Sequence, residues 1–137
     1  QNRTEMMHME FLHPPGWMQP KGYSNGVAAA GRMIFVSGQV GWDAQQVFHT
    51  DDLVGQVRQA LENIVAILAE AGATPTDIVR MSWYLTDKHE YNARLPEIGE
   101  VYRSIIGKHY PAMTALQVCG FIESGASVEI EATAMLA

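Results

Sequence analysis

Glu129 is one residue of this sequence that could take part in proton chemistry. It alternates with Val128 and Ile130, so its side chain faces away from the side on which those two residues pack. A carboxylate in a partly buried cleft can pass protons through a water molecule, and Tyr23 could hydrogen-bond a ligand or that water. The alternatives are a structural glutamate and a tyrosine hydroxyl held by backbone groups at an interface. The residues alone leave both alternatives open.

Other reactive side chains give weaker signals. Cys119 is the only cysteine, and its apolar neighbours predict a buried, unreactive thiol in the middle of a strand. The five histidines show no metal-ligand spacing, so we expect no metal site. Neither a glycine-rich phosphate loop nor a nucleophile elbow occurs. The pair Ser37-Gly38 also suits the end of a strand.

Composition limits the partners. The chain has 137 residues and a net charge of −6, and its nine Lys and Arg residues are scattered, which disfavours nucleic-acid binding. No apolar run approaches the roughly 20 residues of a membrane span. One cysteine fits a reducing compartment, so we expect a cytoplasmic protein. We expect residues 1–19 to form an N-terminal arm, in part a cloning remnant, and residues 20–137 to form one domain.

The patterns in the first half predict an arm, a hairpin and a helix. Residues 11–22 hold three prolines and two glycines, typical of an extended segment, which we expect to lie on apolar surface. Residues 23–30 and 33–38 flank a glycine-containing turn and predict a β-hairpin, followed by a short strand at 47–49. Apolar residues at helical spacing predict a helix from Asp52 to Ala71, closed by Gly72, with Gln56 on its wet face.

The second half predicts a mixed sheet. Residues 78–86 alternate as a strand with Trp83 on the apolar face, and residues 89–106 form a helix that we expect to break at Pro96. Strands at 111–120 and 128–132 complete the chain. Two helices can then cover one face of the sheet, which leaves the other face bare. A bare apolar face usually meets another subunit, so we predict a homo-oligomer.

Several segments, taken in order, resemble the Rid (YjgF-like, RidA) family over about residues 20–135. They are Tyr23-Ser24-Asn25-Gly26-Val27, Phe35-Val36-Ser37-Gly38-Gln39, Gln59-Ala60-Leu61-Glu62-Asn63-Ile64, Ala71-Gly72-Ala73, Leu85-Thr86-Asp87, Pro111-Ala112 and Val128-Glu129-Ile130-Glu131-Ala132. The resemblance implies a chorismate-mutase-like α+β fold and a homotrimer with three intersubunit clefts. It also implies hydrolysis of small reactive enamines and imines without metal or organic cofactor.

The resemblance implies roles for individual residues. Tyr23 matches the family's cleft tyrosine, Ser37 and Gly38 match the pair that lines the pocket, and Glu129 matches the glutamate associated with the attacking water. Met113 stands where deaminating members carry the arginine that grips the substrate carboxylate. We include Thr114 and Cys119, from the same stretch, among the candidate ligand contacts.

The chain departs from the family pattern in ways that bear on its ligand. Gly99 replaces an asparagine, Ala115 replaces a cysteine, and about one helical turn is inserted around Pro96. Methionine cannot form the paired hydrogen bonds that arginine gives a carboxylate, so a small 2-imino acid should bind poorly. Lys21 or Arg94 could supply the missing cation.

Alternatively, Met113 lines a pocket for an apolar or aromatic ligand without a carboxylate, to which Trp17, Trp42 or Phe121 could contribute. Two functions follow from these departures. The protein is either a deaminase-type hydrolase with altered specificity or a non-catalytic, ligand-binding trimer.

Overall fold

The structure is a computed structural model that describes residues 8–137. Its elements are β1 (Met9–Leu12), β2 (Gly26–Ala29), β3 (Arg32–Val40), α2 (Leu53–Glu70), the 3-10 helix η1 (Pro75–Asp77), β4 (Ile78–Leu85), α3 (Lys88–Ala93), α4 (Leu95–Ile105), β5 (Ala112–Gln117) and β6 (Val128–Leu136). This order confirms the predicted mixed α+β fold. The part of the predicted arm that spans residues 1–7 lies outside the described residues. None of the described helices is long and apolar enough to cross a membrane.

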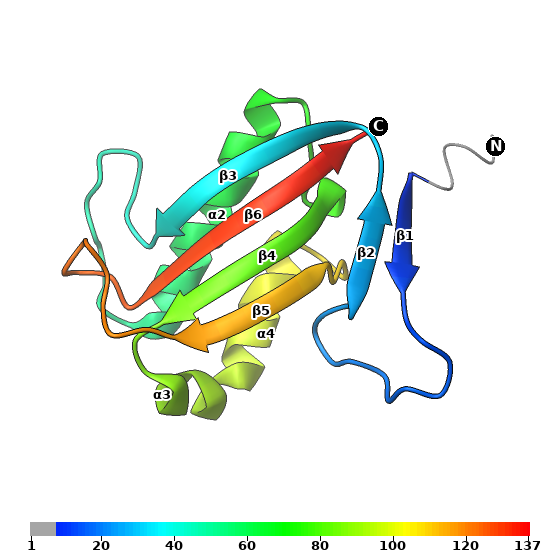
Figure 1. The fold of residues 1–137 in the computed structure, drawn as a ribbon. Coiled ribbons are helices and arrows are strands. Elements are labelled where there is room, and N and C mark those ends of the chain that lie inside the picture. The colour runs from blue at the N-terminus through cyan, green and yellow to red at the C-terminus, as the bar shows by residue number, and fades with distance from the viewer. Residues whose placement is uncertain (1–7) are drawn as a thin grey trace.

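Four strands form the main sheet, in the order β3-β6-β4-β5. β6 runs antiparallel to both β3 and β4, whereas β4 and β5 are parallel. Parallel neighbours need a crossover, and the segment containing α3 and α4 provides it. Figure 1 shows the helices gathered behind one face of the sheet, with the other face open toward the viewer.

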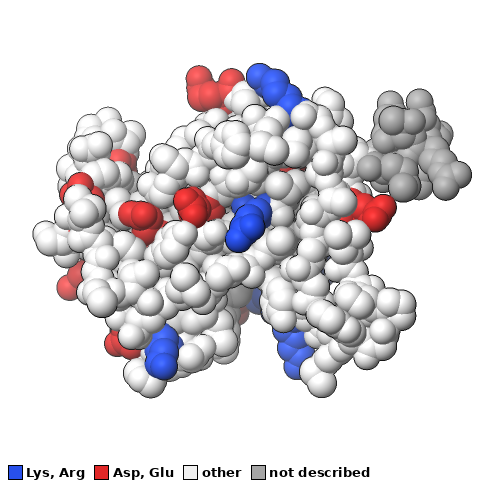
Figure 2. Space-filling view, viewed as in Figure 1, with Lys and Arg blue, Asp and Glu red and all other residues white. Residues whose placement is uncertain are grey.

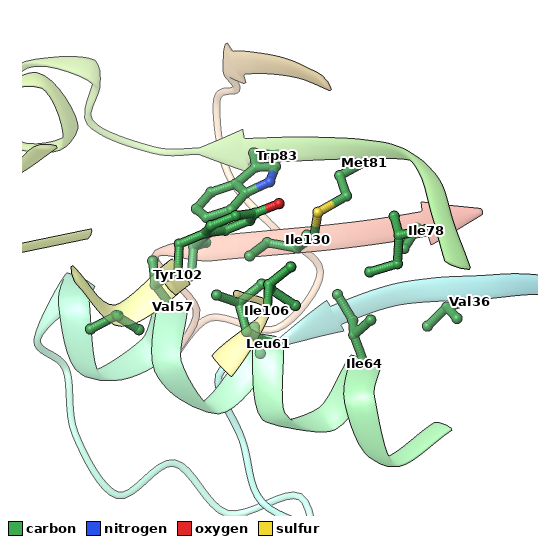
Figure 3. Close-up of a cluster of buried hydrophobic side chains, with 14 of the residues drawn as sticks. Val36, Val57, Leu61, Ile64, Ile78, Met81, Trp83, Tyr102, Ile106 and Ile130 are labelled. Carbon is green, nitrogen blue, oxygen red and sulfur yellow. The ribbon is translucent and has the colours of Figure 1, made fainter. Parts of the chain in front are cut away.

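The core lies between that sheet and the helices. Met81 and Trp83 of β4 and Ile130 of β6 point toward Leu61 and Ile64 of α2, and all five are at most 2% exposed (Figure 3). Each such side chain contributes about 1.5–3 kcal/mol of burial free energy. The alternation predicted for β4 is therefore confirmed, and it determines which face of the sheet packs against the helices.

The helix boundaries follow their capping residues. The Asp52 carboxylate accepts a hydrogen bond from the Gly55 backbone N–H, which caps α2, and Gly72 follows the helix with a φ of 75°. The predicted second helix is divided into α3 and α4, with Pro96 in the first turn of α4. Proline suits this position because its missing N–H would have no helical partner there. The predicted break is confirmed.

Gln56 does not lie on the wet face of α2, as predicted, but is completely buried. Its amide nitrogen donates to the backbone oxygens of Thr50 and Gly125, and its amide oxygen accepts from Ser127 N at 2.8 Å. A buried amide is tolerated only when its donors and acceptors are satisfied. Gln56 therefore joins the helix start to the loop that precedes β6, which helical spacing could not reveal.

The predicted hairpin between residues 23–30 and 33–38 is wrong, because β2 pairs with β1 and not with β3. Ser24 forms a parallel bridge with Ala112 at the start of β5, whereas Gly31 lies against the Leu136 carbonyl at the end of β6. The segment between them thus crosses the end of the sheet (Figure 1). Gly31 permits the turn because its φ of 138° is unfavourable for other residues.

The open face of the sheet is uncovered in the described part of the chain, as predicted. Phe35 is 73% exposed there, beside Arg80 and Tyr84. The described part of the N-terminal arm, residues 8–19, does not cover it. Trp17 is 61% exposed, so this ring is not buried on an apolar surface of its own chain, contrary to the prediction for the arm.

Two smaller predictions are also wrong. β5 ends at Gln117, so Cys119 lies outside the strand and its thiol is exposed. The last link to the sheet is the Val118 N–H, which donates to the Leu85 oxygen before the chain enters the loop. The predicted strand at 47–49 is reduced to a single bridge between Trp42 and Phe48.

Candidate functional site

A pocket of about 430 Å³ opens on the helix-covered side of β5, between that strand and the α3–α4 segment. Its wall is formed by Lys21, Gly22, Tyr23, Trp83, Tyr91, Leu95, Ile98, Gly99, Tyr102, Arg103, Tyr110, Met113 and Ala115. We call it the aromatic pocket. A concave site of this size, apolar with a few polar groups, suits a small organic ligand.

The rings of the pocket form a continuous cluster. Trp83 lies with ring centroids 6.4 Å from Tyr91 and 6.3 Å from Tyr102, and Tyr102 stacks on Tyr110 at 5.7 Å. The Tyr102 hydroxyl donates to the His109 carbonyl oxygen at 2.6 Å. Burial raises the pKa of both Tyr91 and Tyr102, so these phenols stay neutral near pH 7. They can shape and contact a ligand but do not serve as bases.

The structure brings Tyr23 and Met113 together in this pocket. Met113 pairs with Met81 and Ala115 pairs with Trp83, so both β5 side chains face the helices. Tyr23 is fixed by its neighbour Ser24, whose N–H donates to the Pro111 oxygen and whose hydroxyl donates to the Tyr110 oxygen. The contacts of Ser24 with the residues just before β5 therefore place Tyr23 beside that strand.

Arg94 cannot supply the missing cation. Its guanidinium contacts the Asp52 carboxylate at 2.6 Å and the Glu97 carboxylate at 2.8 Å, and these contacts raise its pKa further. Lys21, the other predicted candidate, does line the aromatic pocket, and so does Arg103, which sequence analysis missed.

Glu129 lies on the other face of the sheet, beside a β-bulge in β3. Val36 pairs with Ala132 and Gln39 with Ile130, so Ser37 and Gly38 together stand opposite one residue of β6. A Cβ at position 38 would lie 2.6 Å from the Glu129 Oε2 atom. Glycine thus lets the backbone approach the Glu129 carboxylate, and Ser37 lies beside Gly38 in the same bulge.

A second hollow of about 500 Å³ lies next to this bulge and includes Ser37. The Tyr84 hydroxyl donates to the Glu131 carboxylate across it at 2.7 Å, which raises the pKa of Tyr84. Figure 2 views this face and shows scattered charges without a broad basic patch. The arrangement offers carboxylates and hydroxyls but little to attract a polyanion.

One chain therefore separates the predicted site residues into two groups. Tyr23 and Met113 line the aromatic pocket, whereas Ser37, Gly38 and Glu129 lie on the open face. Thr114 pairs with Ser82 and is exposed, and Cys119 lies in the loop after β5, so neither lines the aromatic pocket.

Most of the pocket's ring wall does not follow from the sequence pattern. Trp83 was predicted only to face the core, and Trp17, Trp42 and Phe121 do not line the pocket. A parallel pairing of residues 78–85 with the strand of Met113 would have identified Trp83 as its neighbour. The i, i+4 spacing of Gly99 and Arg103 was the available signal for the helix wall.

Metal binding finds no support in the described residues, where no group of three His, Cys, Asp or Glu side chains could hold an ion. The closest pairing is His49 with Asp43 at 2.6 Å, which lowers the pKa of Asp43. Two ligands on an exposed loop fall short of the four that a structural zinc needs.

Fold and site together define a small α+β protein with helices on one face of a mixed sheet and a pocket at the sheet's edge strand. The profile of the family described as Endoribonuclease L-PSP matches residues 18–136, and the chain belongs to this family. TdcF of Escherichia coli K12 is 33% identical over 130 residues, which cover 93% of this chain and 95% of TdcF. The human 2-iminobutanoate/2-iminopropanoate deaminase is 32% identical over 122 residues, covering 88% of this chain and 83% of the human protein.

Solved structures give the same result. YyfB of Yersinia pestis, a Rid-family protein of unknown function, aligns with a TM-score of 0.83 and 32% identity, covering 95% of this chain and all of YyfB. Escherichia coli TdcF with bound serine aligns with a TM-score of 0.67 and 30% identity, covering 93% of this chain and 99% of TdcF. The predicted Rid membership and fold are confirmed.

Proposed function

We propose that this protein is a cytoplasmic, deaminase-type hydrolase that acts on a small reactive enamine or imine without a cofactor. The human relative is named a 2-iminobutanoate/2-iminopropanoate deaminase, and the TdcF structure holds serine, a small amino acid. The observation that carries the proposal is the close approach of the Gly38 backbone to the Glu129 carboxylate. This approach builds a polar, proton-accepting position at the edge of a hollow.

The chemistry needs only water and a proton relay. Water adds to the C=N carbon of the imine, and the nitrogen takes up a proton to give a carbinolamine. The carbinolamine hydroxyl then gives up its proton, the nitrogen takes up this second proton, the C–N bond breaks, ammonia leaves, and the carbon becomes a carbonyl. In this scheme Glu129 takes the proton from the attacking water and returns it to the nitrogen.

A complete site requires two subunits in this proposal. The aromatic pocket and Glu129 occupy opposite faces of one sheet, so one chain cannot present both to one ligand. In a homotrimer, the open face of one subunit could meet the β5 edge of the next and join the two groups. The uncovered Phe35 supports such a contact.

Ammonia release tests the proposal. 2-Aminoacrylate and imines of larger amino acids, generated in situ by an amino-acid oxidase or lyase, are supplied to the wild type and to Glu129→Gln. We expect release above the spontaneous rate for at least one substrate and a loss of about 100-fold in the variant, the usual weight of a general base. Glu62→Gln, on the exposed side of α2, is the matched control and keeps full activity. Equal rates for wild type and Glu129→Gln would contradict the role of Glu129.

A non-catalytic, ligand-binding trimer is the alternative function. It is favoured by Met113, which offers no charge to a substrate carboxylate where deaminating members are expected to carry arginine. The same assay separates the two functions, because a binding protein would leave every substrate to its spontaneous rate. RNA cleavage, which the family description mentions, finds little support in a chain of net charge −6.

A further inference from the structure

The charges of the aromatic pocket are all of one sign. Its wall contains Lys21 and Arg103 but no aspartate or glutamate. Neither cation forms an ion pair with any described residue. In a chain with an excess of six acidic charges, a pocket with two unpaired cations attracts anions.

Arg103 lies at the pocket wall, above a position of α4 that has no side chain. It lies four residues after Gly99, on the same side of α4, and a Cβ at position 99 would be 3.0 Å from its Nη1 atom. The guanidinium therefore lies across the glycine, toward the earlier turn of the helix. Glycine is unfavourable inside a helix, so its presence here fits a need for space at the pocket wall.

Rings dominate the rest of the pocket. Trp83, Tyr91 and Tyr110 provide flat apolar surface, and Met113 adds a flexible, polarizable side chain on the β5 side. A ligand that fills the pocket thus places its apolar or aromatic body against these side chains. An anionic group at the α4 end of the ligand would meet the Arg103 fork.

We propose that the aromatic pocket binds a carboxylate that bears an aromatic or bulky apolar group, and that Arg103 of α4 grips the carboxylate in place of position 113. Lys21 adds a second, weaker attraction. This inference rests on the proposed function, since it names the substrate class as imines or enamines of large amino acids. The cation that binds the carboxylate then lies on α4 and not on β5, so the carboxylate of the ligand points toward α4.

Binding measurements with stable ligands test this inference apart from catalysis. Isothermal titration calorimetry on the full chain compares three ligands. 3-Phenylpropanoate has both the ring and the charge. Propanoate lacks the ring, and 3-phenylpropanamide lacks the charge. For the wild type, we expect the dissociation constant of 3-phenylpropanoate to be about tenfold lower than those of the other two, since both ring and charge contribute.

Substitutions at Arg103 then locate the contact. Arg103→Gln should weaken the binding of 3-phenylpropanoate by about tenfold and leave the binding of 3-phenylpropanamide unchanged. Arg103→Lys should retain part of the affinity for 3-phenylpropanoate, because lysine keeps the charge but not the paired donors of the guanidinium. Arg58→Gln, on the exposed side of α2, is the control and should bind as the wild type does. Arg103 is itself exposed, so the variants should fold, which their circular dichroism verifies.

The outcomes distinguish this inference from the proposed function. If 3-phenylpropanoate binds equally well to Arg103→Gln, or no better than propanoate to the wild type, the inference is overturned even when ammonia is released. If Arg103 governs binding but no imine is hydrolysed, the inference stands and the catalytic proposal fails.

Discussion

Met113 is the residue on which the choice of ligand depends. It lies in the aromatic pocket near Tyr23, and a long side chain at this position has open space in front of it. The sequence suggested that an arginine is missing here, and the structure adds that two other cations lie in the same wall.

A Met113→Arg change should therefore create a site for small carboxylates. We expect pyruvate to bind at least about tenfold more tightly to the variant, because the new guanidinium can form two charge-assisted hydrogen bonds. Calorimetric titration measures the gain, and Met113→Leu, which adds no charge, should show none. Unchanged pyruvate affinity would mean that side chains at this position do not reach the ligand.

Gly38 tests the geometry around Glu129 without removing the carboxylate. A Gly38→Ala change places a methyl group 2.6 Å from the original Oε2 position, so the flexible carboxylate must move. We expect ammonia release to fall by about tenfold, since a misplaced base loses its alignment with the water. Thermal unfolding should shift little, because only the end of a side chain has to yield.

Gly120→Ala is the control for that experiment. Its added Cβ would meet no atom within 4 Å, so activity should be unchanged. An active Gly38→Ala enzyme would show that the observed position of Glu129 is not the one used in turnover.

The sequence predicted the two parts of the candidate site unequally. Alternation alone oriented Glu129, because period-2 patterns fix the face of a strand. Arg103 could not be recognised in this way, since an exposed arginine on a helix usually contacts only water. Its position depends on the space above Gly99 and on the parallel neighbour of β5, which are features of tertiary structure.

Among the elements, α2 begins at a residue that serves two purposes. Asp52 caps the helix and also contacts Arg94, and the Arg94 hydrogen bond is the main reason that the pKa of Asp52 lies below 3.8. Because the folded-state pKa lies below the ordinary value of 3.8, this stabilisation is present above that value and is lost as the pH falls from 3.8 through the lower folded-state pKa.

Asp52→Ala should lower the free energy of unfolding by about 1 kcal/mol at pH 7, mostly from the lost cap. Asp52→Asn keeps a capping oxygen and should cost about 0.5 kcal/mol, the value of a partly exposed ion pair. Urea unfolding at pH 7 and pH 3 measures both, and the difference between wild type and Asp52→Asn should shrink at pH 3. A difference that stays constant with pH would exclude an ionic contribution.

Gln56 should be far more important to stability than its polar character suggests. Replacing it by leucine would remove its bonds to Gly125 and Ser127 and leave backbone groups unpaired, at a cost of about 2–4 kcal/mol in the free energy of unfolding. Gln59→Leu, on the same helix, loses only a local bond to Asn63 and should change stability by about 0.5 kcal/mol or less. Urea denaturation compares the two variants.

The strands show where local pattern fails. The helix ends at Asp52 and Gly72 were predictable because capping residues act within a few residues. The partner of β2 was not, because its choice between β1 and β3 depends on the turn at Gly31 and on the Ser24 contact with a segment about 90 residues away.

At the scale of the whole molecule, the open face of the sheet predicts self-association. Light scattering after size exclusion should give three times the 15.1 kDa chain mass for the wild type. Phe35→Glu should shift the mass toward that of one chain, because it buries a charge in the contact. Ile67→Glu, an equally drastic change on the far side of α2, should leave the trimer intact. A wild-type protein that remains a monomer at all concentrations would rule out the intersubunit site.

The bulge at Ser37 and Gly38 has a consequence for solubility. β3 is the edge strand of the main sheet and is nine residues long, and a regular edge of this length offers its free N–H and C=O groups to the strands of other molecules. The extra residue bends β3 and interrupts that row halfway. The irregularity that brings the backbone close to Glu129 therefore also guards the chain against edge-to-edge aggregation. A variant that restores a regular β3 should lose the carboxylate geometry and should aggregate more readily than the wild type.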